Sequence, residues 1–156
     1  MSKRVVLILI LALAFLGIAD AWYLTQSALS DTPLICDVGG TLDGCNIVAQ
    51  SPYSSINGIP LALFGVFFFS FIFVLAALAL WIPRRVVSRA LAILGIVGFL
   101  ASIVFICIQI FLIKAVCLYC FASAAIAFLI YILTSIYNRQ SREPVVQEWE
   151  VTRVVS

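Results

Sequence analysis

The chain has 156 residues, of which 65% are hydrophobic and 10% charged, and its mean hydropathy is +1.23. A soluble domain is nearer half apolar and a quarter charged, so this composition excludes an ordinary soluble protein and indicates one integral membrane domain. Histidine is absent, and five cysteines without histidine argue against a zinc site. No basic patch supports a nucleic-acid role.

The N-terminal segment begins with Lys3 and Arg4 and continues as an apolar run to about residue 24. A basic start, a short apolar stretch and Ala19-Asp20-Ala21 are typical of a secretory signal with a cleavage site. Alternatively, residues 5–24 form a membrane span with aromatic anchors at its outer end. We favour the span because the later helices need a fourth wall, and in either case the chain after it lies outside.

Residues 25–58 form the one substantial polar segment between spans, and we expect it to be an outer loop. It contains acidic residues but neither lysine nor arginine. Glycines between Cys36 and Cys45 predict a tight, hairpin-like turn with a cysteine at each end. From Cys45 to Ser51 we expect a short helix along the membrane surface.

Three further apolar segments are each long enough to cross a bilayer, over residues 59–82, 90–113 and 116–137. Pro60 suits the first turn of the earliest of them, where its missing N–H costs nothing. Residues 138–156 form a polar tail that we expect in the cytoplasm. The sequence therefore predicts an all-α integral membrane protein. Residues 1–137 would form a four-transmembrane-helix bundle whose outer loop carries the short surface helix.

The basic residues test this topology, because four spans place both termini on one side of the membrane. Lysine and arginine concentrate in the segments that share that side: Lys3, Arg4, Arg84, Arg85, Arg89, Arg139 and Arg142. Lys114 falls on the opposite side. The positive-inside rule then puts both termini in the cytoplasm. Four cysteines would lie at or near the outer face, where disulfides form and persist: Cys36, Cys45, Cys117 and Cys120.

Cys117 and Cys120 form a Cys-x-x-Cys at the start of the last span, where the free N–H groups of a first helical turn favour a thiolate. With Cys36 and Cys45 on the loop, two pairs on one face suggest a relay by thiol–disulfide exchange. The alternative is two structural disulfides that staple an exposed loop; the membrane-edge position of the Cys-x-x-Cys favours the relay. Cys107, midway along the third span, is expected to act as a small apolar side chain.

The cysteines belong to a wider set of motifs. These are Cys36, Cys45-Asn46-Ile47-Val48, Ser51, Tyr53-Ser54, Gly58-Ile59-Pro60, Gly65 and Cys117-Leu118-Tyr119-Cys120. Together they resemble the vitamin K epoxide reductase family, and its prokaryotic members most closely. The other quinone-linked oxidase design with four spans has its cysteine pairs in the opposite order. Many prokaryotic members of the family carry a fused thioredoxin-like domain. This chain ends at Ser156 without one, so the resemblance implies a separate thioredoxin-fold partner.

The resemblance also implies a chemistry, that of a thiol oxidoreductase built around a quinone pocket. Cys36 would take electrons from the partner, and Cys45 would pass them to Cys117. Cys120 would face the quinone and reduce it. Ser51 would help to orient a quinone ring of the ubiquinone, menaquinone or vitamin K type.

The implied setting is a prokaryotic plasma membrane, with the membrane quinone pool as electron acceptor and disulfide-bond formation in the partner as the outcome. Two alternatives stay open. One is a vitamin K epoxide or quinone reductase in an ER membrane, which uses the same cysteines. The other is a non-enzymatic membrane scaffold whose outer loop is held by disulfides.

Overall fold

The computed structural model describes residues 2–30, 32–34, 44–82 and 84–155, and for residues 142–155 it describes the backbone alone. The elements in chain order are α1 (Lys3–Ser30), α2 (Gly44–Ala49), β1 (Ser55–Ile56), β2 (Ile59–Pro60), α3 (Leu61–Trp81), α4 (Arg85–Cys107), a π-helix (Ile108–Ile113) and α5 (Leu118–Val155). The described residues are predominantly helical, and the predicted all-α bundle is confirmed.

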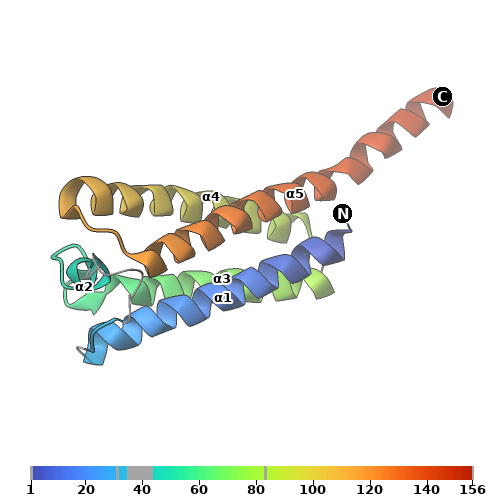
Figure 1. Cartoon of the computed structure of the whole chain (residues 1–156). Coiled ribbons are helices and arrows are strands. Elements are labelled where there is room, and N and C mark those ends of the chain that lie inside the picture. The colour runs from blue at the N-terminus through green and yellow to red at the C-terminus, as the bar shows by residue number, and fades with distance from the viewer. Residues whose placement is uncertain (1, 31, 35–43, 83, 156) are drawn as a thin grey trace.

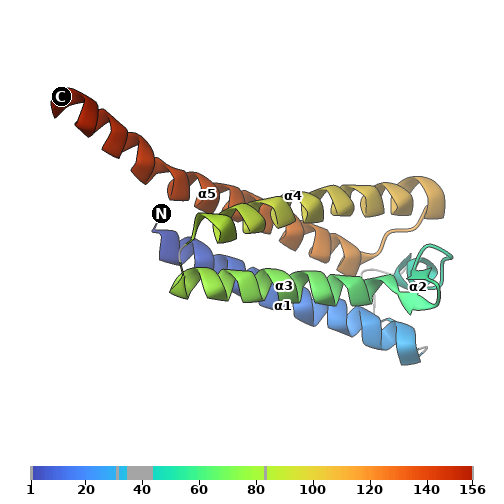
Figure 2. The same cartoon turned by 180° about the vertical axis from the view of Figure 1, so that it is seen from behind.

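The four long helices lie side by side (Figures 1 and 2). α1 packs against α3 and α5, and α4 packs against α5 and α3. α2 gathers at one end of the bundle with the turn between α4 and α5, while the N-terminus lies at the other end (Figure 1). At that second end α5 continues as a helix beyond the bundle, through residues that we expected only to be a polar tail.

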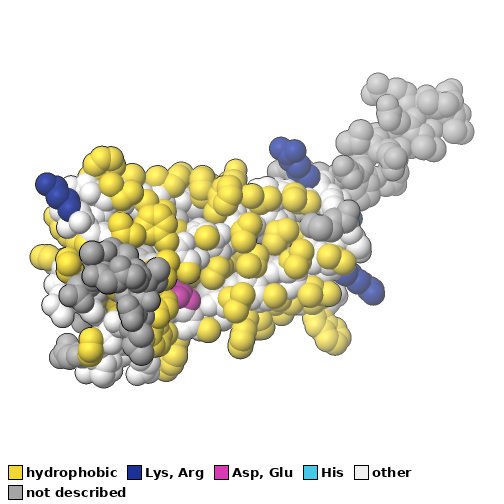
Figure 3. Space-filling view, in the orientation of Figure 1, with side chains coloured by type: hydrophobic (Ala, Val, Ile, Leu, Met, Phe, Trp, Pro, Cys, Tyr) yellow, Lys and Arg dark blue, Asp and Glu magenta, His cyan; other side chains and the backbone are white. Residues whose placement is uncertain are grey.

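Each long helix has the length and apolar composition needed to cross a membrane: Lys3–Ser30, Leu61–Trp81, Arg85–Ile113 and Leu118–Ser141. Large apolar side chains point outward along them; Trp81 is 87% exposed and Phe111 72%. Figure 3 shows this apolar surface in yellow, with lysine and arginine side chains towards the two ends of the bundle. Helices satisfy their own backbone hydrogen bonds, so a bundle with such a surface suits a lipid environment. The protein is a membrane protein.

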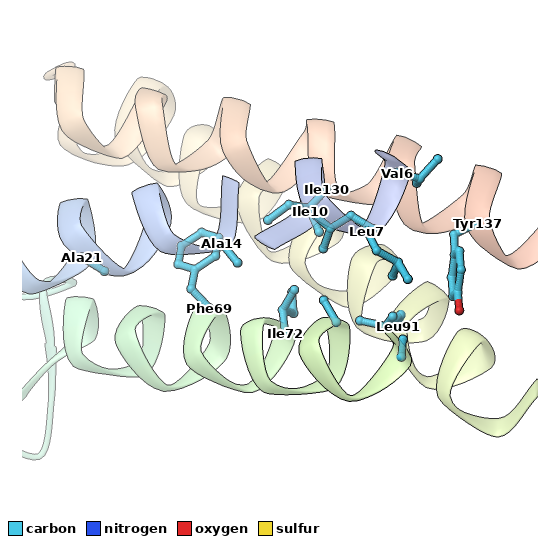
Figure 4. Packing of buried hydrophobic residues seen from close by; sticks show 12 residues of the cluster. Val6, Leu7, Ile10, Ala14, Ala21, Phe69, Ile72, Leu91, Ile130 and Tyr137 are labelled. Atoms are coloured by element: carbon cyan, nitrogen blue, oxygen red, sulfur yellow. The ribbon is translucent and has the colours of Figure 1, made fainter. Parts of the chain in front are cut away.

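The interior of the bundle is filled by branched apolar side chains from all four long helices. Ile10 of α1, Ile72 of α3, Leu91 of α4 and Ile130 of α5 are buried and belong to one packed cluster (Figure 4). Lipid tails are as apolar as these side chains, so close packing rather than exclusion from water holds the helices together.

Gly95 lets α4 and α5 approach closely. A Cβ built on Gly95 would overlap the hydroxyl oxygen of Thr134 and would lie 3.1 Å from the Cα of Tyr131. Small residues at such crossings allow helix backbones to come together in a membrane. The buried Thr134 hydroxyl donates to the Ile130 carbonyl at 2.8 Å, so the contact leaves this hydroxyl satisfied.

A short antiparallel hairpin, β1 and β2, precedes α3. Its turn residues Asn57 and Gly58 have φ angles of 50° and 80°. Asparagine followed by glycine is the pair that tolerates positive φ at both central positions of a two-residue hairpin turn. Because the hairpin extends through Pro60, that residue caps α3 and the helix begins at Leu61, two residues after the predicted start of the span at residue 59.

Candidate active site

Cys117 and Cys120 lie at the N-terminal end of α5. The backbone N–H of Phe121 donates to the Cys117 carbonyl at 3.1 Å, as the helix starts. The N–H of Cys120 donates to the Cys117 Sγ at 3.3 Å, so this sulfur satisfies one of the free donors of the first turn. Both cysteines are free thiols, and the Cys120 Sγ–H donates to the Cys117 Sγ across 2.7 Å.

These hydrogen bonds favour a thiolate at Cys117. The bond from the Cys120 thiol lowers the pKa of Cys117, and backbone N–H groups act in the same direction, whereas burial opposes them. Cys117 is only 1% exposed. The arrangement therefore gives Cys117 the chemistry of an exchange-competent sulfur while keeping it away from bulk water.

The π-helix directly before this pair positions Cys117. It ends at Lys114, whose backbone is left-handed, with φ 57° and ψ 30°. The backbone carbonyl of Gln109 accepts the Ala115 N–H at 3.2 Å, and the side-chain Oε1 of Gln109 accepts the Cys117 N–H at 3.2 Å. One residue of the π-helix thus holds both the turn and the first cysteine of the pair. π-Helical turns are frequent at functional sites.

Cys45 lies in the first turn of α2 and packs beside the Cys-x-x-Cys. It is disulfide-bonded, 2% exposed, and shares one buried cluster with Cys117. Next to it, Gly44 approaches Val116 so closely that a Cβ would overlap the Val116 carbonyl oxygen. The fold therefore brings one loop cysteine to the membrane pair. Cys36, the other predicted loop cysteine, lies outside the described residues.

Asn46 fixes α2 to the chain that leaves α1. Its Oδ1 accepts the Leu34 N–H at 2.8 Å, and its Nδ2 donates to the Leu34 carbonyl at 3.5 Å. Leu34 is buried in the same cluster as Cys45 and Cys117. This two-point amide contact holds α2, and with it Cys45, over the start of α5.

A cavity of about 350 Å³ lies beside the cysteines, within the range of about 300–1,000 Å³ that small-molecule sites occupy. Cys45, Cys117 and Cys120 all line it. Aromatic side chains from α3 and α4 form much of its wall: Phe64, Phe68, Phe69 and Phe105. An apolar cavity with aromatic walls and a few polar groups suits a flat, hydrophobic ring such as a quinone. Cys107, a free thiol exposed on α4, is not among the lining residues.

Ser51 also lines this cavity and is half-buried. Its hydroxyl donates to the Val48 carbonyl at 2.7 Å, and its own carbonyl accepts the Ser54 hydroxyl at 2.8 Å. The hydroxyl hydrogen of Ser51 is therefore already engaged in a hydrogen bond to the backbone. In this arrangement its hydroxyl oxygen offers a ligand an acceptor only.

Two polar contacts of the site were not anticipated as functional from the sequence. Ser123, one helical turn after Cys120, donates a hydrogen bond to the Asp20 carboxylate, which links α5 to α1. Gln109 is buried beside Cys117. Polar and ionisable residues inside membrane spans are costly and mark functional positions by default. That signal, a lone carboxyl and a lone amide within apolar runs, was present in the sequence.

The sequence matches a known family over most of its length. Residues 8–135 match the profile of the Vitamin K epoxide reductase family, a range that includes all five cysteines. No curated protein matches the chain. Family members are quinone-linked thiol–disulfide oxidoreductases, and the match agrees with the four apolar helices and the paired cysteines described above. The chain therefore belongs to the vitamin K epoxide reductase family, and it is a membrane oxidoreductase.

Proposed function

We propose that this protein oxidises the dithiol of a thioredoxin-fold partner outside the cytoplasm of a prokaryotic cell and passes the electrons to a membrane quinone. The partner gains a disulfide, so the reaction supports disulfide-bond formation. One observation carries the proposal. Disulfide-bonded Cys45 packs with Cys117, and Cys117 is a free thiol hydrogen-bonded to free Cys120 beside an apolar cavity.

The first exchange would take place on the loop. By the resemblance to the family, Cys36 would be the loop cysteine that meets the partner, and in this relay it pairs with Cys45. A thiolate of the partner protein attacks Cys36 and releases Cys45 as a thiolate. The second thiol of the partner then attacks the first and releases Cys36. The partner leaves with a disulfide, and the loop pair holds the two electrons.

The second exchange would pass these electrons to the membrane pair in its oxidised form. Cys45 attacks Cys117 and releases Cys120 as a thiolate. Cys36 then attacks Cys45, which restores the loop disulfide and releases Cys117. The packing of Cys45 with Cys117 supports this route. The lowered pKa of Cys117 favours its departure, because thiols of lower pKa leave faster.

The third step would return the membrane pair to its disulfide. A bound quinone supplies an acceptor for two electrons and two protons. Cys117 and Cys120 give up their two thiol protons and two electrons and close to a disulfide, so the step balances. In the structure Cys45 is oxidised while Cys117 and Cys120 are reduced, which is the state that this step requires. Ser51, on the cavity wall, would help to orient the ring by contact and not by donating a hydrogen bond, because its hydroxyl already donates to Val48.

Anaerobic turnover tests the proposal. The full chain in lipid nanodiscs is mixed with a reduced thioredoxin-fold protein and decylubiquinone, and quinol and partner disulfide are both measured. Wild type should form one quinol for each partner disulfide. Cys117→Ala and Cys120→Ala should each reduce the rate to the uncatalysed background. Cys107→Ala, the matched control, replaces an exposed thiol outside the cavity and should leave the rate unchanged.

Four results would count against the proposal. Full turnover in Cys117→Ala would show that the electrons do not pass through the Cys117–Cys120 pair. Continued oxidation of the partner without quinone or oxygen, after the protein's own disulfides have been reduced, would show that a quinone is not the electron acceptor. Reduction of a vitamin K epoxide in place of the quinone would favour an epoxide reductase. A folded wild type with no turnover at all would favour a stapled scaffold.

A further inference from the structure

Gln109 is a buried amide in a segment that is otherwise apolar. It is 4% exposed, and its neighbours within the π-helix are isoleucine, phenylalanine and leucine. Burying an amide costs free energy unless its donors and acceptor find partners. The hydrogen-bond partners of Gln109 therefore indicate the role of its side chain.

The oxygen end of the Gln109 amide is fixed. Its Oε1 accepts the buried N–H of Cys117 at 3.2 Å. Among the described residues no acceptor is recorded for the two N–H groups of Nε2. Gln109 lines the same cavity as Cys117 and Cys120. Because an amide is planar, anchoring Oε1 on the cysteine pair also sets the direction of Nε2.

The hydroxyl groups on the cavity wall are already used as donors. Ser51 donates to Val48, and Ser54 to Ser51. Ser102 donates to the Gly98 carbonyl at 2.8 Å. Ser123 donates to Asp20. Among these described lining residues, Gln109 is therefore the deeply buried side chain whose N–H groups are not already used as donors. The remaining hydroxyl on the wall belongs to Tyr53, which is 51% exposed.

We propose that Nε2 of Gln109 donates a hydrogen bond to a carbonyl oxygen of the quinone and so positions the ring against the Cys117–Cys120 pair. The same amide would then hold both reactants, the cysteine pair through Oε1 and the acceptor through Nε2. A quinone carbonyl is a pure acceptor, so an otherwise unpartnered donor is the complementary group. This inference rests on the proposed function, since it names the group that recognises the quinone.

Binding of two ligands tests the assignment. Decylubiquinone and decylbenzene, which has a similar ring and tail but no carbonyl, are titrated into the full chain in nanodiscs. Gln109→Met removes the donor at nearly constant length. It should weaken decylubiquinone binding about tenfold, the effect of one hydrogen bond, and leave decylbenzene binding unchanged. Cys107→Ala is the control, because it replaces a side chain of α4 that does not line the cavity.

Gln109→Glu keeps an oxygen for the Cys117 N–H and adds a pH readout. The protonated carboxyl can donate to the quinone, whereas the carboxylate cannot, so decylubiquinone affinity should fall with rising pH in this variant and not in wild type. This variant also serves if Gln109→Met does not fold.

Two results would overturn the inference while leaving the proposed function in place. In one, wild type and both Gln109 variants bind decylubiquinone equally and without pH dependence. In the other, Gln109→Met weakens both ligands equally, which would make Gln109 a structural residue. If wild type binds decylbenzene but no quinone, the proposed function and this inference fail together.

Discussion

Cys117 and Cys120 differ in their hydrogen bonding although they are neighbours on one helical turn. Cys117 accepts hydrogen bonds from the Cys120 thiol and from the Cys120 N–H, and Gln109 holds its own N–H. Cys120 is the donor in that pair. The two thiols are therefore arranged so that charge collects on Cys117, which shares a buried cluster with the loop cysteine Cys45.

This asymmetry predicts how the pKa of Cys117 responds to its neighbour. The hydrogen bond from Cys120 holds the pKa of Cys117 below its usual range, so Cys120→Ala should raise that pKa. At a pH between the two values, Cys117 would be a thiolate in the reduced wild type and a neutral thiol in the variant. Titration of ¹³Cβ-labelled cysteine by NMR measures both values. An unchanged midpoint in Cys120→Ala would show that the hydrogen bond does not set the pKa.

Helix α5 bears the Cys117–Cys120 pair at its start and is held against the neighbouring helices by close contacts. Gly95 brings α4 against Thr134, and Ser123 bonds Asp20 of α1. Both contacts hold the helix whose first turn bears the cysteines. They couple the packing of the bundle to the position of the site.

Enlarging Gly95 should separate α4 from α5. Gly95→Val places its side chain where the Thr134 hydroxyl lies, and overpacking of this kind costs about 1–3 kcal/mol. Thermal unfolding in detergent should show the loss. Ala122→Val adds two methyl groups on an exposed face of α5 and is the control. Equal stability of Gly95→Val and Ala122→Val would contradict the close packing described for Gly95.

Removing the Ser123 hydroxyl should also destabilise the protein. In Ser123→Ala the Asp20 carboxyl stays within a membrane span without its donor, and an unsatisfied polar group of this kind costs about 1–3 kcal/mol. The double variant Ser123→Ala with Asp20→Leu should recover much of that loss, because both partners are then gone. Thermal unfolding of the three proteins measures it. If Ser123→Ala is as stable as wild type, the Ser123–Asp20 hydrogen bond does not contribute to the free energy of unfolding.

The spans could be predicted because each is a long, uniformly apolar run, and length and composition suffice for that. The π-helix could not, because its apolar residues are as compatible with an α-helix. The wider turn accompanies the contact of Gln109 with Cys117, which joins residues on either side of the turn. The hairpin at Asn57-Gly58 is predictable from sequence, since asparagine followed by glycine is a strong turn signal.

The candidate site could likewise be predicted only in part from the sequence. Spacing identified Cys117 and Cys120 as a pair, and the structure brings Cys45 to them. Spacing could not reveal that the Ser51 hydroxyl already donates to the loop, or that Asp20 meets Ser123. Both depend on side-chain direction and on which helices become neighbours.

The proposed relay requires that the whole molecule has a defined orientation in the membrane. The end that bears α2 and the cysteine site is opposite the end that bears the N-terminus (Figure 1). The basic residues of the sequence favour a cytoplasmic location for the N-terminal end. The site would then face the compartment where disulfides form.

Reporter fusions test that orientation. In this orientation, alkaline phosphatase joined after Lys114 should be active, because the fusion point follows the third span and would lie outside. The same enzyme joined after Arg84 or after Ser141 should be inactive, because both points lie on the cytoplasmic side. Fluorescent-protein fusions at the three points should give the reverse pattern. Activity after Arg84 and not after Lys114 would invert the topology and place the cysteines in a reducing compartment.

The most direct test of the relay is the disulfide that accumulates when its last step is blocked. In Cys120→Ala, Cys45 can still join Cys117, but no Cys120 remains to re-form the membrane disulfide. Mass spectrometry of the acid-quenched protein should therefore find a Cys45–Cys117 bond and a free Cys36. If the variant instead holds Cys45 in its loop disulfide with Cys117 as a free thiol, no electrons pass between the two pairs and the relay is wrong.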